Sequence, residues 1–337
     1  MNIVHGGDIF RIANQRRWDW REVLDFSANI NPLGPAPGVP DAIRAAIDRI
    51  RCYPSPESVA LSALLSQQWH VPAAQILLGN GATDLLHFFA RIRPEEPVTL
   101  VVPTFSEFHR AYPNAAMARW DDFEAWPTSG LVVLTTPNNP TGRVARGDLL
   151  QDWLLSTSHP VMVDESFLDF TDSPSVLNLL PRRPDLFVLR SLTKFYAIPG
   201  LRVGALVGGE EEIAVLRHFR EPWQVNVLAE AAAIASVQDS DYAIRSRSFI
   251  EQERPWLMER VAQFPGVRVE PSCVNFLYAR LDYNPARLCA FLLERKMLLR
   301  SCSLWKGFEQ PSVRVAVRTR EENKRLLDAW GEFRCDS

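Results

Sequence analysis

Short apolar segments alternate with amphipathic stretches from about residue 75 onward. Segments of strand length occur at QILLG, PVTLVVP, LVVLTTP, PVMVDES, DLFVLRS and VGALVGG, and helical patterns follow the first three. The strand segments are apolar throughout rather than at alternate positions, which is typical of parallel strands that are covered on both faces. The pattern therefore predicts an α/β domain with a largely parallel sheet between helices.

The two flanks of this region have different patterns. The turn-rich segment INPLGPAPGVP has no strong strand signal and predicts an extended arm that leads into the helix DAIRAAIDRIR. After about residue 240, a long helix is followed by VRVEP, VNFLYARL, another helix and SVRVAVR, which predicts a smaller α+β unit. We expect an N-terminal arm that joins the small domain at 1–37, a large domain at 38–238 and a small C-terminal domain at 239–337. A ligand is expected in the crevice between them, at the carboxyl ends of the parallel strands.

Charge and composition exclude several classes of protein. Lys and Arg number 37 against 40 Asp and Glu, a net charge of −3, which argues against a nucleic-acid surface as the main feature of the chain. The longest apolar runs have strand length rather than the ~20 residues of a membrane helix. No secretion signal is recognisable, so a cytoplasmic location is expected. The five cysteines are widely spaced, which predicts neither a disulfide framework nor a metal site.

Lysine is scarce in this chain, and that makes one lysine conspicuous. Only four of the 37 basic residues are lysines, and Lys194 is the only one in the first 295 residues. It follows the strand DLFVLRS, with hydroxyls nearby at Ser191 and Thr193 and with Arg202 eight residues later. A lone lysine is normally a solvated surface residue, but the surface cations here are almost all arginine. Lysine forms an imine with a carbonyl and arginine does not, so an amine nucleophile is predicted at Lys194.

Three other strand ends carry polar motifs. GNGATD after the first strand opens a helix whose N-terminus suits an anion, although such a turn is often only a connection. PNNPTG is a rigid turn that presents Asn138 or Asn139, or is simply a loop. The pair Asp164 and Glu165 follows a buried-looking run, where a carboxylate requires a cation unless it caps a helix. Together with Lys194, these strand ends supply the groups that hold and tune pyridoxal 5′-phosphate (PLP).

At these motifs the chain resembles the fold-type I PLP enzymes of the aspartate aminotransferase superfamily. PNNPTG, DES and SLTKFYAIPGLRVG carry the resemblance in that order, GNGATD supports it, and it covers essentially the whole chain. The resemblance implies a mostly parallel sheet flanked by helices, a smaller α+β domain, and PLP as the cofactor. It also implies these contacts: an imine with Lys194, the pyridine nitrogen on Asp164, the 3′-oxygen on Asn139, ring stacking by Phe105, and the cofactor phosphate on Gly81, Ala82, Thr83, Ser191 and Arg202.

The same resemblance implies a partner subunit and an anionic substrate. Tyr53 in CYPSPES resembles the tyrosine that reaches the phosphate from the neighbouring subunit, which implies a homodimer with shared sites. Histidinol-phosphate aminotransferases share the cofactor motifs but have a tyrosine where this chain has Phe167. L-Threonine-O-3-phosphate decarboxylases resemble the chain more closely, at HGGDI, DFSANINPLG, LRSC and VRVAVR. That resemblance implies that His5, Asn29 and Arg300 bind the substrate phosphate and that Arg314 binds the carboxylate.

Without the resemblance, Asn29 would be interpreted as a turn cap and Arg314 as a surface strand residue. With it, we predict PLP-dependent decarboxylation of L-threonine O-3-phosphate to (R)-1-aminopropan-2-yl phosphate and CO2, in cobalamin biosynthesis. A histidinol-phosphate or related aminotransferase is the alternative. A cofactor-binding regulator would need a DNA-binding module, for which the segment before residue 30 leaves no room. Neither nucleic acid nor a membrane is expected as a partner.

Overall fold

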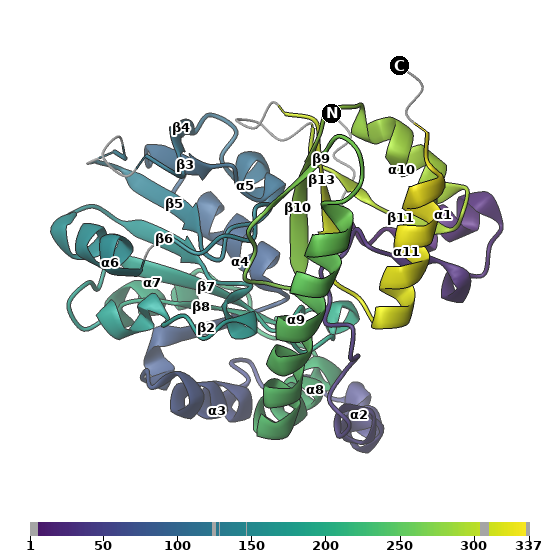
Figure 1. The fold of residues 1–337 in the computed structure, drawn as a ribbon. Helices are drawn as coiled ribbons and strands as arrows, with labels where there is room; N and C mark the ends of the chain where they lie inside the picture. Colours follow the sequence, from purple (N-terminus) through teal and green to yellow (C-terminus); the bar gives the residue numbers. More distant parts are fainter. Residues whose placement is uncertain (1–5, 123–125, 128, 146, 304–309, 335–337) are drawn as a thin grey trace.

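The computed structural model describes residues 6–122, 126–127, 129–145, 147–303 and 310–334. A seven-stranded sheet forms its centre, in the order β2-β8-β7-β6-β5-β3-β4 (Figure 1). The strands are, in that order, β2 Ile76–Gly79, β8 Gly204–Val207, β7 Leu186–Ser191, β6 Val161–Asp164, β5 Leu131–Thr135, β3 Val98–Val102 and β4 Ala116–Arg119. Only β8 runs antiparallel to its neighbours in this sheet. The predicted mostly parallel sheet is therefore confirmed.

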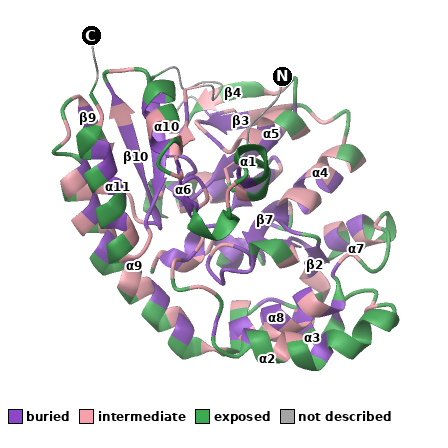
Figure 2. Ribbon diagram, turned by 90° about the vertical axis from the view of Figure 1, so that its right-hand side faces the viewer, coloured by how far each residue is buried: buried purple, intermediate pink, exposed green. Residues whose placement is uncertain are grey.

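Helices cover both faces of this sheet, which is why its strands are apolar at every position. One face packs against α4 Ala82–Ile92, α5 Ser106–Ala111 and α7 Glu210–His218. The other face packs against α3 Val59–Trp69, α6 Gly147–Ser156 and the N-terminal half of α9 Ser240–Val261. Successive residues of β5 show the alternation, because Val132 and Leu134 belong to one core cluster and Val133 to the other. The central strands are accordingly buried along their whole length (Figure 2).

A second, antiparallel sheet follows in the C-terminal part of the chain. Its order is β12-β13-β10-β9, with α9, α10 Pro285–Leu293 and α11 Arg320–Glu332 beside it. The strands are β9 Val267–Glu270, β10 Phe276–Leu281, β12 Arg300–Ser301 and β13 Ser312–Ala316. The α+β pattern expected after residue 240 is thus present, whereas the boundaries at 37/38 and 238/239 stay predictions.

The N-terminal segment lies against this C-terminal part, although no strand was predicted there. The two-residue strand β1 Leu24–Asp25 pairs in parallel with β11 Met297–Leu298. The amide of Ala316 also donates to the carbonyl of Phe26, at 2.9 Å. Figure 1 shows the purple N-terminal and yellow C-terminal segments side by side. Beyond this contact the chain continues into α2 Val39–Ala46, which packs on α8 Val227–Gln238.

Asn31 joins this arm to two other parts of the chain. Its backbone amide donates to the carbonyl of Lys194, at 3.0 Å. Its Nδ2 lies 2.9 Å from the carbonyl of Phe195, 3.0 Å from the hydroxyl of Tyr242 and 2.7 Å from that of Ser246. One buried amide therefore fixes the arm to the loop after β7 and to α9.

Two further expectations concern the chain as a whole. No helix in the part of the chain that the structure describes has both the length and the hydropathy to cross a membrane. Cys52, Cys273, Cys289 and Cys302 are free.

The contacts of Asn31 predict a specific loss of stability. Asn31→Ala removes the shared donor and leaves buried oxygens without it, so the free energy of unfolding should fall by about 1–3 kcal/mol. Chemical denaturation of the purified protein measures this change. Asn14→Ala, on the exposed face of α1 Ile9–Arg16, is the control and should change it by less than about 0.5 kcal/mol. Equal changes in the two variants would contradict the role of Asn31.

Candidate active site

Lys194 lies just beyond the end of β7, in buried surroundings that disfavour its charged form. Its Nζ donates to Ser191 Oγ at 2.9 Å and lies 5.4 Å from the centre of the Phe167 ring. Burial lowers the pKa of Lys194 to about 8; the Asp164 carboxylate opposes this shift, and the Arg202 and Arg314 guanidinium groups add to it. A neutral amine is therefore accessible near physiological pH, as imine formation requires.

Asp164 is the last residue of β6 and lies beside β7 in the sheet. Its side chain is buried, and Oδ1 accepts a hydrogen bond from the amide of Ser166 at 2.9 Å. Burial raises the pKa of this carboxyl, whereas the Lys194 ammonium and the bond from Ser166 lower it. The residue caps no helix, since the following 3-10 helix has Phe167 at its N-cap. A buried carboxylate beside a cation suits the partner of a protonated ring nitrogen.

The neighbouring carboxylate, Glu165, belongs to a different environment. Its oxygens accept from the hydroxyl of Ser175 at 2.6 Å and from the amide of Val176 at 2.8 Å, and one lies 3.2 Å from Arg190. Consecutive side chains at the end of a strand point to opposite faces. Of these two adjacent acids, Asp164 is the one coupled to Lys194.

The PNNPTG turn uses its two asparagines differently. Asn138 is structural, because Oδ1 accepts from the hydroxyl of Thr141 at 2.8 Å and Nδ2 donates to the carbonyl of Pro103 at 2.8 Å. Asn139 Oδ1 instead accepts from a guanidinium nitrogen of Arg314, at 2.6 Å. The choice between Asn138 and Asn139 therefore falls on Asn139 as the residue that reaches the site.

The predicted phosphate cradle is assembled at the ends of β2, β7 and β8. Gly204 pairs with both Gly79 and Ser191, so the segment after β2 lies beside Ser191. Gly81 has φ +90°, and a Cβ there would lie 2.3 Å from a guanidinium nitrogen of Arg202. α4 starts at Ala82 without a side-chain cap, so the amides of its first turn point into the same place. Residues 81–83, Ser191 and Arg202 thus fit a phosphate group.

Two further residues are predicted to contact the cofactor. Phe105 precedes α5 and packs edge-on against Phe108, with 6.4 Å between the ring centres. Tyr53 is 80% exposed, and its ring packs against that of Trp223 with 4.7 Å between the ring centres. Its predicted contact is with the cofactor of a second subunit, and this contact stays a prediction.

The two arginines that are predicted to bind the substrate carboxylate and the substrate phosphate lie side by side. Arg300 on β12 is directly opposite Arg314 on β13, so their side chains share one face of the sheet. Burial lowers the pKa of both groups, to about 10 for Arg314, and the charge of Arg300 lowers the pKa of Arg314 further. Arg314 also donates to the carbonyl of Ser27 at 2.7 Å. Two facing cations are an arrangement that bound anions stabilise.

Asn29 lies two residues after Ser27, the arm residue whose carbonyl accepts from Arg314. Its side chain is buried, and neither amide atom has a hydrogen-bond partner among the described residues. A turn cap would use these atoms, and a buried amide without a partner is costly. Asn29 therefore suits a polar ligand. His5, predicted to accompany it, lies outside the described residues.

Sequence reasoning missed two residues that shape this pocket. Ser27 supplies the carbonyl that holds Arg314, and the Phe276 ring lies 5.4 Å from the Arg314 guanidinium carbon. Phe276 also packs edge-on against Phe167, at 5.1 Å between ring centres. The alternation in VNFLYARL carried a signal for Phe276, whereas nothing in the sequence singles out a backbone carbonyl.

Comparisons with known proteins agree with these features. The family model "Aminotransferase class I and II" matches residues 21–329. Threonine-phosphate decarboxylase of Salmonella typhimurium is 35% identical over 97% of this chain and 96% of its own length. Histidinol-phosphate aminotransferase of Methanothermobacter thermautotrophicus is 29% identical over 98% of this chain and 94% of its own length.

Solved structures are similar over nearly the whole chain. L-Threonine-O-3-phosphate decarboxylase from Porphyromonas gingivalis superposes with a TM-score of 0.84 at 24% identity, covering 92% of this chain and 98% of that one. The histidinol-phosphate aminotransferase from Clostridium acetobutylicum has a TM-score of 0.83 at 26% identity, with the same coverage. The two activities therefore occur on one fold, and the fold alone does not separate them.

The environment of Lys194 predicts where and when PLP attaches. Borohydride reduction of the reconstituted protein should fix PLP on the peptide that contains Lys194. The reconstitution rate of the apoprotein should rise with pH up to about 8 and then level off, because the neutral amine is the nucleophile and burial lowers its pKa to about 8. An unperturbed lysine would continue to gain reactivity toward about pH 10.4.

Peptide mapping and stopped-flow absorbance measure these two results. Lys296→Ala is the matched control, because Lys296 is paired with Glu22 at the surface and should leave both results unchanged. Label on Lys296, Lys306 or Lys324 in the wild-type protein would show that the assignment is wrong.

Proposed function

We propose that this chain, which belongs to the class I and II aminotransferase family, decarboxylates L-threonine O-3-phosphate. The family depends on PLP, and the chain is an enzyme of this PLP-dependent type. The residues described above fit that cofactor: Asp164 for its ring nitrogen, Asn139 for its 3′-oxygen, Lys194 for its aldehyde and residues 81–83 with Ser191 and Arg202 for its phosphate. When bound, PLP accepts the electron pair left when a bond to the substrate α-carbon breaks.

The facing pair Arg300 and Arg314 is the observation that carries the substrate assignment. A guanidinium group binds a carboxylate or a phosphate in bidentate fashion, so two adjacent arginines match a small molecule with both groups. Arg314 is fixed by Asn139 and by the carbonyl of Ser27, so it holds the carboxylate at a set position relative to the cofactor. Arg300 then takes the phosphate, and the unpartnered amide of Asn29 adds a donor there.

Binding at two anionic ends also explains the choice of reaction. Which bond to the substrate α-carbon breaks depends on how the substrate is oriented, and such positioning contributes roughly 7–11 kcal/mol at most. In our proposal Arg300, Asn29 and His5 would hold the substrate in the orientation in which the bond to its carboxylate breaks and CO2 is released. The product is (R)-1-aminopropan-2-yl phosphate. The 35% identical threonine-phosphate decarboxylase supports this choice. We also propose that the reaction serves cobalamin biosynthesis in the cytoplasm.

A histidinol-phosphate aminotransferase is the second candidate, favoured by the similarity to such enzymes at 29% identity. It would also use an arginine for the substrate phosphate. The two activities differ in stoichiometry, since transamination consumes a 2-oxo acid and decarboxylation does not.

We further propose a homodimer with shared active sites. An exposed apolar surface lies around Tyr53, and we call it the Tyr53 surface; it comprises Ile47, Ile50, Tyr53, Val59 and Trp223, each at least 46% exposed. Such a surface is typical of an interface between subunits. A symmetric contact through it would carry the phenol of Tyr53 to the neighbouring subunit.

The substrate assignment predicts a split between two arginine variants. The holoenzyme should release CO2 from threonine phosphate without a 2-oxo acid. Arg300→Ala should raise the KM for threonine phosphate at least about tenfold, because charge-assisted hydrogen bonds contribute ~1.5–3 kcal/mol each. The same variant should change the KM for unphosphorylated threonine little. Arg314→Ala should impair both substrates. Steady-state kinetics with CO2 detection measure these effects.

Arg268→Ala, on the exposed side of β9, is the control and should match the wild type. Equal losses for both substrates in Arg300→Ala, together with turnover of histidinol phosphate that requires a 2-oxo acid, would favour the aminotransferase.

The Tyr53 surface predicts a dimer that one charge disrupts. Ile50→Asp should shift the protein from dimer to monomer in sedimentation velocity, because it places a carboxylate in an apolar contact. The monomer should also bind PLP more weakly, since it lacks Tyr53 of the neighbouring subunit. Val215→Asp, at a 52% exposed position on α7, should remain dimeric. A wild-type monomer with full activity would contradict the proposal.

A further inference from the structure

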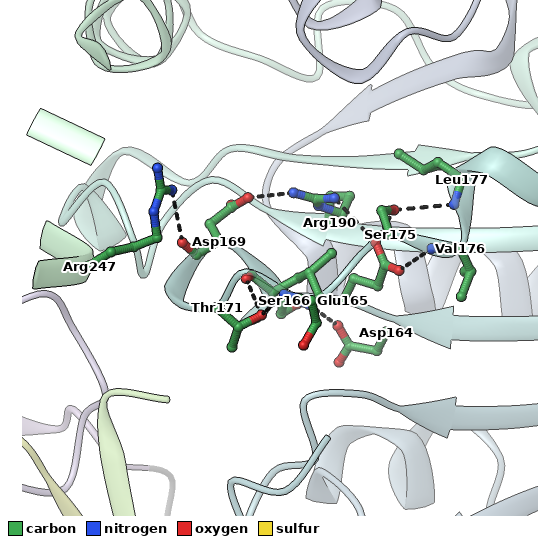
Figure 3. Close-up of polar contacts among 12 residues, drawn as sticks. Asp164, Glu165, Ser166, Asp169, Thr171, Ser175, Val176, Leu177, Arg190 and Arg247 are labelled. Carbon is green, nitrogen blue, oxygen red and sulfur yellow. Dashed lines mark hydrogen bonds and ion pairs between the residues drawn. The ribbon is translucent and has the colours of Figure 1, made fainter. Parts of the chain in front are cut away.

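Behind Asp164, three charged side chains form a group that we call the Arg190 cluster: Glu165, Asp169 and Arg190. One terminal nitrogen of Arg190 lies 3.2 Å from Glu165 Oε2 and the other 2.5 Å from Asp169 Oδ1. Glu165 and Arg190 are buried and Asp169 is partly buried. Figure 3 shows Arg190 between the two carboxylates, with Asp164 on the other side of the β6 backbone.

The cluster sits where two strands leave the sheet toward the site. Glu165 follows Asp164 directly, and its amide donates to the carbonyl of Leu189 in β7 at 2.9 Å. Arg190 directly precedes Ser191, the residue that contacts Lys194 Nζ. The Glu165–Arg190 pair therefore joins the two chain segments that carry Asp164 and Lys194.

Other elements hold the cluster in place. Glu165 accepts from Ser175 and from the amide of Val176, at the start of the 3-10 helix Val176–Leu179. The carbonyl of Asp169 accepts from Arg247 of α9 at 3.5 Å (Figure 3). The Arg190 guanidinium carbon lies 5.0 Å from the centre of the Trp69 ring of α3. These contacts connect the ends of β6 and β7 to α3, α9 and two short helices.

Stability alone does not account for such a cluster. Taking an ion pair out of water costs about as much as its attraction returns, and apolar replacements of the same size are often equally stable. The surrounding core is large and apolar. A buried guanidinium group that binds two carboxylates fixes their relative positions, because its planar arrangement of N–H donors sets the geometry of both hydrogen-bonded partners.

We propose that Glu165 and Arg190 are positioning residues, which hold the ends of β6 and β7 at the separation that PLP requires between Asp164 and Lys194. The pyridine ring of the cofactor is rigid, so the distance between its nitrogen and the ring carbon that carries the aldehyde group is fixed. A shift of one strand end against the other therefore moves one contact out of reach. The inference rests on the proposed roles of Asp164 and Lys194.

The test compares two matched variants. Glu165→Gln removes the charge with little change in volume. Glu253→Gln does the same to a buried glutamate of α9 that is paired with Arg320, outside the candidate site. Both should lower the melting temperature. Only Glu165→Gln should raise the Kd of the apoprotein for PLP, by about tenfold or more, and change the visible circular dichroism of bound PLP, which reports the orientation of the ring. It should also lower kcat with little change in KM.

A double variant separates positioning from stability. In Glu165→Gln/Arg190→Met both fully buried charges are gone and only the partly exposed Asp169 loses its partner, so the melting temperature should recover toward the wild-type value. The weak PLP binding and the altered dichroism should persist. Arg190→Lys keeps a charge but not the fork, and should give intermediate values. If PLP affinity recovers together with the melting temperature, or if Glu165→Gln binds PLP like Glu253→Gln, the cluster is only structural and the inference is wrong.

The same samples distinguish this failure from failure of the proposed site. Borohydride reduction of the wild-type protein labels Lys194 if the site is assigned correctly, whatever the Glu165 variants do. Label elsewhere removes the basis of both proposals, whereas label at Lys194 with unchanged dichroism in Glu165→Gln overturns only the role of the cluster.

Discussion

The burial of Asp164 beside Lys194 is the constraint on which the site depends. An acid at the end of a buried parallel strand is destabilised by desolvation, and a nearby cation is needed to keep it ionised. The same burial lowers the pKa of the amine that provides this cation. Each group therefore has a property that it would lack in water. The Asp164 carboxylate requires a positively charged partner, and the Lys194 amine loses its proton at a lower pH. The fold supplies both by ending β6 and the β7 loop at one edge of the sheet.

The arm applies a second constraint, because it reaches the site through backbone atoms. The carbonyl of Ser27 holds Arg314, and the amide of Asn31 holds the carbonyl of Lys194. Between these two contacts lies Asn29, whose amide has no described partner. The proposed role of the arm in substrate recognition and the placement of Lys194 are thus connected over five residues of chain, and a displacement of the arm would change both.

Much of this arrangement could be predicted from the sequence, because the strands are buried on both faces and so form unbroken apolar runs. Polar residues directly after such runs lie at one edge of the sheet, which gave Lys194 and Asp164. β4 was missed because it is a short strand with mostly exposed residues, and β1 because two residues show no period. The turn pattern by itself did not separate Asn139 from Asn138, and only the family resemblance favoured Asn139, since its partner Arg314 is 175 residues away. The Arg190 cluster was hidden for the same reason: the alternation of Asp164 and Glu165 is visible, but the positions of their partners are not.

The basic groups at the candidate site explain why anionic ligands would also reduce electrostatic repulsion there. Lys194, Arg202, Arg300 and Arg314 bring four basic groups to a region where Asp164 is the acid coupled to the nucleophile. Burial is the main cause of the lowered pKa values of Lys194 and Arg314, and repulsion by the neighbouring guanidinium groups lowers them further. A cofactor phosphate and, in the proposed reaction, a doubly anionic substrate would relieve this repulsion on binding. Part of the binding free energy is then available to fix the substrate in one orientation, and orientation is what separates decarboxylation from transamination on this fold.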